Sequence, residues 1–295
     1  MHRNGGKMDN FANPSYDRIT GEAIWSSISF GSYPQTEVKG SSLVAEIKEA
    51  EYDENGDALA DGIKYRRISK DDTEFAGYFG DSHFRYFKWE KINWRVLWND
   101  GTTLFVMPDK GIDCKAYNDA IISITWEECT MRKWLNNDFY NMAFSRDEQK
   151  AIITSKVQNG PVPKYMSGNG NNTEDKLYLL SIPELRNPAY GFWEEKMYWE
   201  HKKDKKLNRR MKPSDYAHAR GAAICTRKDT AALVTKASIG NCSWWLRSRC
   251  SNTNYGAEVN ASGGIFSVGY YTRIFENAVV PVMHLDLKEL PDILK

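Results

Sequence analysis

The sequence predicts an α+β fold in which helices are bracketed by β-hairpins. Apolar and polar residues alternate from Ile92 to Trp98 and a turn signal follows, which indicates a hairpin. From Trp126 to Asn136 the apolar residues recur instead at helical spacing. After Ser243 short apolar runs separated by glycine turns return. No internal repeat of about 20–50 residues is present, which excludes solenoids and propellers.

The composition is that of a globular protein without a strong electric field. Hydrophobic residues make up 41% of the 295 residues, enough to bury a core. Forty basic residues nearly cancel 39 acidic ones, so nucleic acid and anionic membranes are disfavoured partners. Residues 1–24 contain no apolar run that could act as a signal peptide, and no run of about 18 apolar residues occurs. We therefore expect cytoplasmic synthesis without membrane insertion, and a virion or surface location only through a partner.

The chain divides into an arm and one domain. Residues 1–26 are polar and rich in Gly and Asn, which predicts a flexible N-terminal arm. Residues 27–295 are expected to form a single domain. Within it, residues 187–212 are strongly charged with opposite charges interspersed, which predicts a solvated insertion.

Two hairpins are expected in the first third of the domain. In the first, Leu43, Ala45 and Ile47 alternate, Asn55-Gly56 provides a turn, and the alternation resumes at Ile63. In the second, the strand ending at Trp98 turns at Asn99-Asp100-Gly101 and returns through residues 104–107.

Helix and strand signals alternate in the rest of the chain. Thr125 and Glu128 form a capping box before the helix at residues 126–136, and Ser145 with Glu148 repeats it before a second helix. Residues 177–180 indicate a buried strand that leads into a helix capped by Ser181. Short strands are expected at residues 244–246, 256–259, 265–268 and 278–283.

Residues that could carry catalysis are scattered. The five histidines do not cluster, and no HExxH, GxSxG or phosphate-binding glycine motif is present. No CxxC pair occurs among the five cysteines, so reduced thiols are expected. Cys242 and Cys250 flank one short segment, and a thiol- or metal-dependent site built on them is the enzymatic alternative. No cofactor is predicted.

Two polar and aromatic clusters near the C-terminus form the candidate binding surface. Glycine turns between them would place short strands side by side, and Tyr, Ser, Asn and Arg are the residues that binding surfaces favour. The first cluster is Arg249, Cys250, Ser251, Asn252, Thr253, Asn254 and Tyr255, and the second is Tyr270, Tyr271, Thr272, Arg273, Ile274 and Phe275, with Asn260 and Phe266 between them.

Five motifs occur in an order that resembles a bacterial and phage domain family of unassigned activity, whose fold is similar to C-type lectins and sulfatase-modifying factors. They are Phe30-Gly31-Ser32-Tyr33-Pro34-Gln35, Ile92-Asn93-Trp94-Arg95-Val96-Leu97, Asp113-Cys114-Lys115-Ala116-Tyr117-Asn118, Arg132-Lys133-Trp134-Leu135-Asn136 and Ser243-Trp244-Trp245-Leu246-Arg247-Ser248. The resemblance implies a twisted antiparallel sheet with two main helices, long loops, and adjacent N- and C-terminal strands.

The resemblance also implies a function. In this family the segment after the Trp-Trp-Leu-Arg-Ser motif serves as the variable region of diversity-generating retroelements, in which mutagenesis at adenines rewrites surface codons. Every residue of the two clusters is reachable from an AAC or AAT codon by such changes. Two family features are missing: Arg249-Cys250 replaces the usual Pro-Gly, and residues 278–282 lack the usual arginine.

The sequence therefore predicts a ligand-binding module whose C-terminal surface contacts a protein or a glycan. The sulfatase-modifying branch uses a close cysteine pair and copper, and the spacing of Cys242 and Cys250 does not match it. Besides the thiol- or metal-dependent enzyme, a structural phage or cell-surface component that docks through residues 1–26 remains an alternative.

Overall fold

The protein is described by a computed structural model for residues 11–73, 75–160, 170–194, 208–226, 238–250 and 254–290. The fold is mixed, with β-sheets predominating and few helices, so the predicted combination of helices and sheets is confirmed at this level. An eight-stranded sheet and a five-stranded sheet share one hydrophobic core that includes residues from Ile28 to Leu290. No helix in the described ranges is long and apolar enough to cross a membrane.

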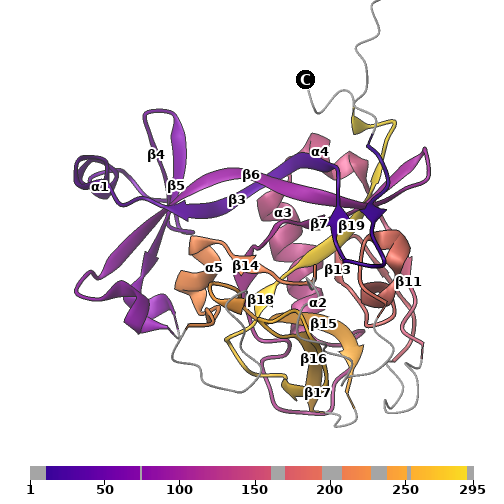
Figure 1. Cartoon of the computed structure of the whole chain (residues 1–295). Helices are drawn as coiled ribbons and strands as arrows, with labels where there is room; N and C mark the ends of the chain where they lie inside the picture. Colours follow the sequence, from indigo (N-terminus) through magenta and orange to yellow (C-terminus); the bar gives the residue numbers. More distant parts are fainter. Residues whose placement is uncertain are drawn as a thin grey trace, which may run out of the picture.

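The eight-stranded sheet contains the longest strands (Figure 1). Its order is β10 (Ile152–Ile153), β19 (Pro281–Asp286), β7 (Thr103–Pro108), β6 (Phe84–Asn99), β5 (Ile63–Ser69) and β4 (Asp57–Ala60), while β3 (Ser27–Glu37) pairs with β6 and β13 (Tyr178–Leu179) with β19. All of these pairings are antiparallel. Strands β3 and β19 are separated by β6 and β7, so the expectation of adjacent N- and C-terminal strands is wrong.

The five-stranded sheet has the order β17 (Ile265–Tyr271), β16 (Tyr255–Val259), β15 (Trp244–Arg249), β18 (Ala278–Val279) and β9 (Asp113–Cys114). Three further strand pairs are β1 (Ser15–Tyr16) with β2 (Ala23–Ile24), β11 (Ser155–Val157) with β12 (Thr173–Asp175), and β14 (Lys212–Pro213) with β8 (Lys110–Gly111). The predicted C-terminal strands are thus confirmed.

Helices are short. The α-helices are α1 (Ser41–Lys48), α2 (Thr130–Trp134), α3 (Tyr140–Ala143), α4 (Arg146–Ala151) and α5 (Asp215–Arg220), and single turns lie at Lys70–Asp72, Ala76–Phe79, Glu184–Arg186 and Pro188–Tyr190. A π-helical turn at Leu135–Phe139 joins α2 to α3.

The predicted first hairpin is wrong, whereas the second is confirmed. Residues 41–48 form α1, because Leu43, Val44 and Ile47 are also three and four residues apart and pack on a small cluster beside β4 and β5. The turn between β4 and β5 is Asp61-Gly62, with φ of 47° and 72°. Strands β6 and β7 form the second hairpin as expected.

Two of the three helix starts differ from the prediction. Helix α2 begins at Thr130, and the Cys129 thiol, rather than Thr125, accepts the capping hydrogen bond from the Arg132 N–H at 3.4 Å. The capping box of Ser145 and Glu148 is confirmed. After β13 the chain makes only a single 3-10 turn instead of a helix.

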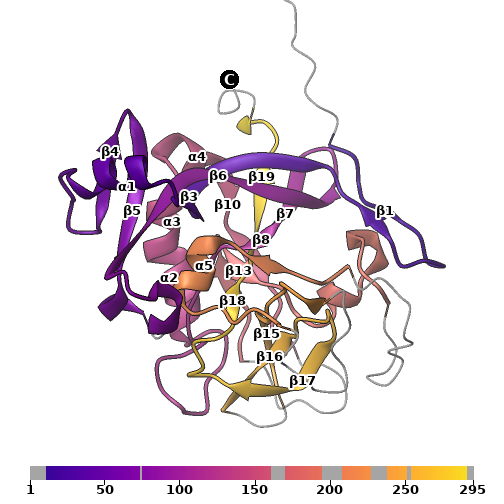
Figure 2. The same ribbon diagram turned by 60° about the vertical axis from the view of Figure 1, so that its left-hand side comes forward.

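The N-terminal arm contacts the domain from residue 11 onward. The Asn13 side chain donates to the Asn99 carbonyl at 2.9 Å and accepts from the Asn99 N–H at 2.6 Å. Strands β1 and β2 follow as a hairpin, which Figure 2 shows projecting from the body. The flexible-arm prediction is therefore restricted to residues 1–10, which lie outside the described residues, as do residues 195–207 of the charged insertion.

Candidate ligand-binding surface

Strands β15, β16 and β17 lie at the end of the molecule opposite β3 and β6 (Figures 1 and 2). β17 is the edge strand of its sheet and pairs with β16 alone among the described strands. This end of the sheet therefore combines an exposed edge strand with the turn between β16 and β17, and it carries the described residues of both predicted clusters.

A bulge in β17 shapes this surface. Gly256 pairs with Tyr270 but Glu258 pairs with Phe266, so three residues of β17 oppose the single residue Ala257. Gly269 lies in the bulge with φ of 78°, and a Cβ there would lie 2.1 Å from the Cys250 sulfur. Only glycine fits this backbone and this close approach.

Three tyrosines share the surface and are called the tyrosine surface below. Tyr255 opposes Tyr271 across the two strands, with ring centroids 4.5 Å apart. Tyr270 lies edge-on to Tyr271 at 6.4 Å. Tyr270 is 46% exposed and Tyr271 47% exposed, and a hydrogen bond with Tyr271 raises the pKa of Tyr255. The rings of Tyr270 and Tyr271 are thus open to solvent, whereas Tyr255 is half-buried and packs against the core.

Some of the predicted site residues do not face solvent. Cys250 is fully buried beneath the bulge, and Thr272 is 1% exposed because its hydroxyl and backbone hold a neighbouring loop. Neither side chain is open to solvent in this structure, and their contact with a ligand stays a prediction. Asn260 accepts from the N–H groups of Ser262 and Gly264, so its side chain stabilises the turn between β16 and β17.

The other predicted residues have mixed exposure. Arg273 is exposed, and Asn254, Phe266, Ile274 and Phe275 are half-buried. Arg249 is half-buried and donates to the Ser123 hydroxyl at 2.6 Å. Residues 251–253 lie outside the described residues, so the middle of the first cluster has no structural account.

Residues 118–123, called the isoleucine loop below, adjoin the surface and were not predicted. The Asn118 N–H donates to the Thr272 carbonyl at 2.9 Å, and Arg249 holds the other end at Ser123. Ile121 and Ile122 are each 50% exposed. An apolar pair within an otherwise polar loop was the sequence signal that could have identified them.

The Trp-Trp-Leu-Arg-Ser motif supports the surface from inside. The indoles of Trp244 and Trp245 are fully buried and donate to the carbonyls of Arg209 and Lys115. Ser248 accepts from the Ile182 N–H at 2.9 Å. These contacts fix β15 in the core, so the motif is structural.

Arg247 has the largest set of contacts in this motif. Its guanidinium makes a two-point ion pair with Glu184, in which Nη2 lies 3.0 Å from Oε1. Nη1 also donates to the Leu179 carbonyl at 2.7 Å, and Nε donates to Asn159 Oδ1 at 3.3 Å. The side chain is 4% exposed, so β15 is tied to β13 and to the turn after it through a buried cation.

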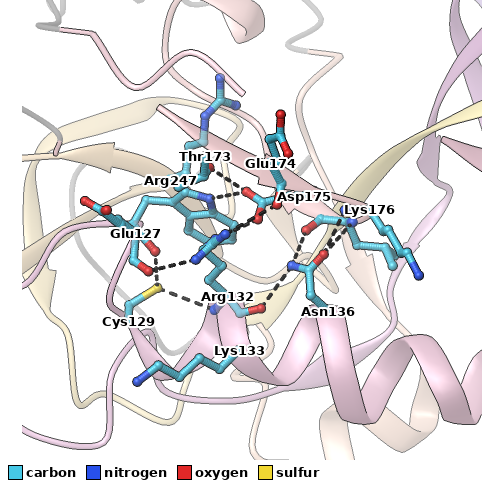
Figure 3. A network of polar contacts seen from close by, with 12 residues as sticks. Glu127, Cys129, Arg132, Lys133, Asn136, Thr173, Glu174, Asp175, Lys176 and Arg247 are labelled. Carbon is cyan, nitrogen blue, oxygen red and sulfur yellow. Dashed lines mark hydrogen bonds and ion pairs between the residues drawn. The ribbon is translucent and has the colours of Figure 1, made fainter. Parts of the chain in front are cut away.

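A second polar network continues from Arg247 (Figure 3). Asn159 donates to the Thr173 hydroxyl, which in turn donates to Asp175 at 2.7 Å. Asp175 is 1% exposed and also accepts from Arg132 Nε at 2.6 Å and from the Trp126 indole at 2.9 Å. Both oxygens of this carboxylate therefore accept hydrogen bonds from the protein, which indicates a structural role in connecting α2 with β12.

The thiol-based alternative is not supported by the arrangement of the cysteines. Cys242 and Cys250 flank β15 at its opposite ends, eight positions apart, which corresponds to a separation on the order of 25 Å along a strand. Burial raises the pKa of both thiols to about 12. Within the described part of the chain no group of three or more His, Cys, Asp or Glu side chains could hold a metal ion.

One buried carboxyl lies behind the surface. Glu258 on β16 is 8% exposed, and burial raises its pKa above the ordinary value of 4.5. The Asn277 amide donates to it at 2.5 Å and partly compensates for this burial. Its role is therefore to connect β16 with the segment before β18.

Fold and surface define a mixed domain, dominated by antiparallel sheets, with an exposed aromatic edge. Residues 100–287, more than half of the chain, match the family described as a domain of unknown function, DUF6273, and the chain belongs to this family. The match includes β15 to β17, both polar networks and the isoleucine loop. No curated protein and no solved structure matches the chain.

Proposed function

We propose that this protein is a ligand-binding module of the C-type-lectin-like kind, and that the tyrosine surface contacts its ligand. The observation that carries the proposal is the exposure of Tyr270 and Tyr271 at a sheet edge whose interior is fully packed. Tyrosine offers a large apolar area and a hydroxyl at a low cost in conformational entropy, which makes it frequent in binding surfaces.

The polar networks support the same proposal. Arg247 and Asp175 have their hydrogen bonds satisfied inside the fold and are not open to a substrate. Rigid support below a surface reduces the entropy lost on binding. A sheet whose strand β15 is fixed in the core and whose edge strand β17 is exposed is suited to recognition more than to bond-breaking chemistry.

Replacing Tyr270 and Tyr271 together with alanine should abolish ligand binding and change the melting temperature little, because both rings are about half exposed. Proteins retained on the wild-type protein but not on the variant are identified by mass spectrometry, and each is then titrated by calorimetry.

The matched control replaces Leu59 with alanine, since this side chain is 70% exposed on β4, far along the other sheet. This variant should bind as the wild type does. A large loss of melting temperature for the tyrosine variant, or unchanged binding, would contradict the proposal.

We also propose that a retroelement diversifies the two clusters. Support comes from the residue types, all reachable from adenine-rich codons, and from the exposure of Tyr270, Tyr271 and Arg273. Sequencing the flanking DNA should find a near-copy of the 3′ end that differs at adenines, beside a reverse transcriptase gene. A flank without both would contradict diversification and leave the binding proposal intact.

A further inference from the structure

A pocket with a volume of about 360 Å³ lies at the C-terminal end of α5. This volume is at the lower end of the range for small-molecule sites. Segments that are far apart in the sequence line the pocket, namely residues 71–73, Cys114-Lys115, Arg220 and Phe275. Cys114-Lys115 belongs to one of the five sequence motifs and Phe275 to the second predicted cluster. The pocket therefore joins two sequence features that lie outside the tyrosine surface.

Hydrogen bonds hold the walls of the pocket together. The Thr73 hydroxyl donates to the Ala219 carbonyl at 2.8 Å, and Cys114 Sγ donates to the Phe275 carbonyl at 3.2 Å. Gly221 packs closely against the same place, since an added Cβ would lie 2.7 Å from the Phe275 oxygen and 3.5 Å from the Cys114 sulfur. The fold itself thus shapes the pocket, as is usual for sites that bind small molecules.

Arg220 brings a positive charge into the pocket with only part of its donors occupied. Nη1 donates to the Asp72 carbonyl at 2.9 Å, and Nε lies 3.7 Å from Asp113 Oδ1. Neither Nε nor Nη2 forms a hydrogen bond with the described residues. The Asp113 carboxylate is already engaged, because Oδ2 accepts from the Tyr33 hydroxyl at 2.6 Å and Oδ1 from the Cys114 N–H at 2.7 Å. The Arg220 side chain is 29% exposed, so its guanidinium can reach an anion in the pocket.

Lys115 supplies a second positive charge. Its ammonium lies 5.3 Å from the centroid of the Trp134 ring. An aromatic face holds an ammonium group without neutralising it. Lys115 forms no ion pair with the part of the chain that the structure describes. Two basic side chains that line one pocket without pairing with its carboxylates favour an anionic ligand.

The acidic side chains of the pocket favour a ligand with a single negative charge. Asp72 Oδ2 accepts from the Ser69 N–H at 3.2 Å, and Asp71 Oδ2 lies 3.7 Å from His83 Nε2. Both carboxylates thus have contacts of their own, but their charges still offset the two cations. Repulsion grows with the charge of the ligand, so phosphate is less favoured here than a monocarboxylate. A carboxylate also matches the planar guanidinium of Arg220.

We propose that this pocket binds a small organic monocarboxylate, whose carboxylate contacts Arg220 and Lys115 and whose hydrocarbon part lies against Phe275. The inference goes beyond the proposed function, because it assigns a second site that shares no residue with the tyrosine surface. Failure of one proposal therefore leaves the other standing.

The test is calorimetric titration of the full chain at constant ionic strength. The probes are acetate, benzoate and phenylacetate, each beside its neutral amide, and inorganic phosphate. The site variants are Arg220→Gln and Lys115→Gln, and the second keeps the test valid if the first does not fold. The matched control is Lys91→Gln, because Lys91 lines another cavity but already pairs with Glu148 at 2.8 Å. Melting temperatures show which variants are folded.

At least one carboxylate should bind more tightly than its amide and than phosphate. Each folded site variant should weaken this binding by about tenfold or more, because a charge-assisted contact is removed. Lys91→Gln and Tyr270→Ala/Tyr271→Ala should bind the carboxylate as the wild type does. Equal binding of acid and amide, tighter binding of phosphate, no binding of any carboxylate, or wild-type binding by Lys115→Gln would overturn the inference. Loss of binding with the tyrosine variant would place the carboxylate at the tyrosine surface and overturn it as well.

Discussion

Replacing Arg247 with alanine is expected to lower the free energy of unfolding by about 3–5 kcal/mol, which is the cost of removing one partner of a buried ion pair. Glu184 loses its two-point partner, and the Leu179 carbonyl loses a donor. Urea titration followed by circular dichroism measures this change. The free energy of unfolding of Arg247→Lys should lie between those of the wild type and Arg247→Ala, because lysine keeps the charge but not the planar guanidinium.

Lys150→Ala is the control for this experiment. Lys150 pairs with Asp147, and both side chains are mostly exposed, so the pair contributes little to stability. The unfolding midpoint of this variant should match that of the wild type. If Arg247→Ala unfolds at the wild-type midpoint as well, the guanidinium is not a structural connection and must be reconsidered as a functional group.

Replacing Gly269 with alanine is expected to cost about 2–4 kcal/mol, because a positive φ and an overlap with Cys250 are combined at this position. The added Cβ would lie 2.1 Å from the Cys250 sulfur and 2.6 Å from the Gly256 carbonyl oxygen. Thermal and urea unfolding report the loss. The bulge should also shift, so binding at Tyr270 should weaken.

Replacing Gly240 with alanine separates the effect of the positive φ from that of the overlap with Cys250. The Gly240 φ of 82° is close to that of Gly269, but no atom lies within 4 Å of an added Cβ. Gly240→Ala should therefore cost only about 1 kcal/mol, the cost of placing a Cβ on a left-handed backbone. The double variant Cys250→Ala/Gly269→Ala should recover part of the loss, since the sulfur is removed. Equal losses for Gly240→Ala and Gly269→Ala would show that the bulge accommodates a methyl group.

The candidate site was predictable in part. Tyr255, Tyr270 and Tyr271 were found because aromatic and polar residues between glycine turns indicate an exposed β edge. Cys250 and Thr272 were assigned to the same surface because composition carries no information on which face a side chain takes. A bulge changes the alternation of β17, and only its position decides that Cys250 is covered.

The isoleucine loop could not be placed from the sequence for a different reason. Asn118 and Thr272 are 154 positions apart, and their hydrogen bond exists only because β9, β15 and β16 belong to one sheet. Long-range contacts of this kind leave no periodic signal in the chain. The same holds for Glu184 and Asp175, whose partners come from distant strands and helices.

By itself, the sequence determined the mixed fold, the β6–β7 hairpin, the capping box at Ser145 and the C-terminal strands, because alternation, capping and glycine turns act over a few residues. Tertiary structure alone decided that residues 41–48 are helical, that β3 and β19 are not neighbours, and which cluster residues are exposed. These outcomes depend on packing between segments far apart in the chain, where burial of apolar area outweighs local preference.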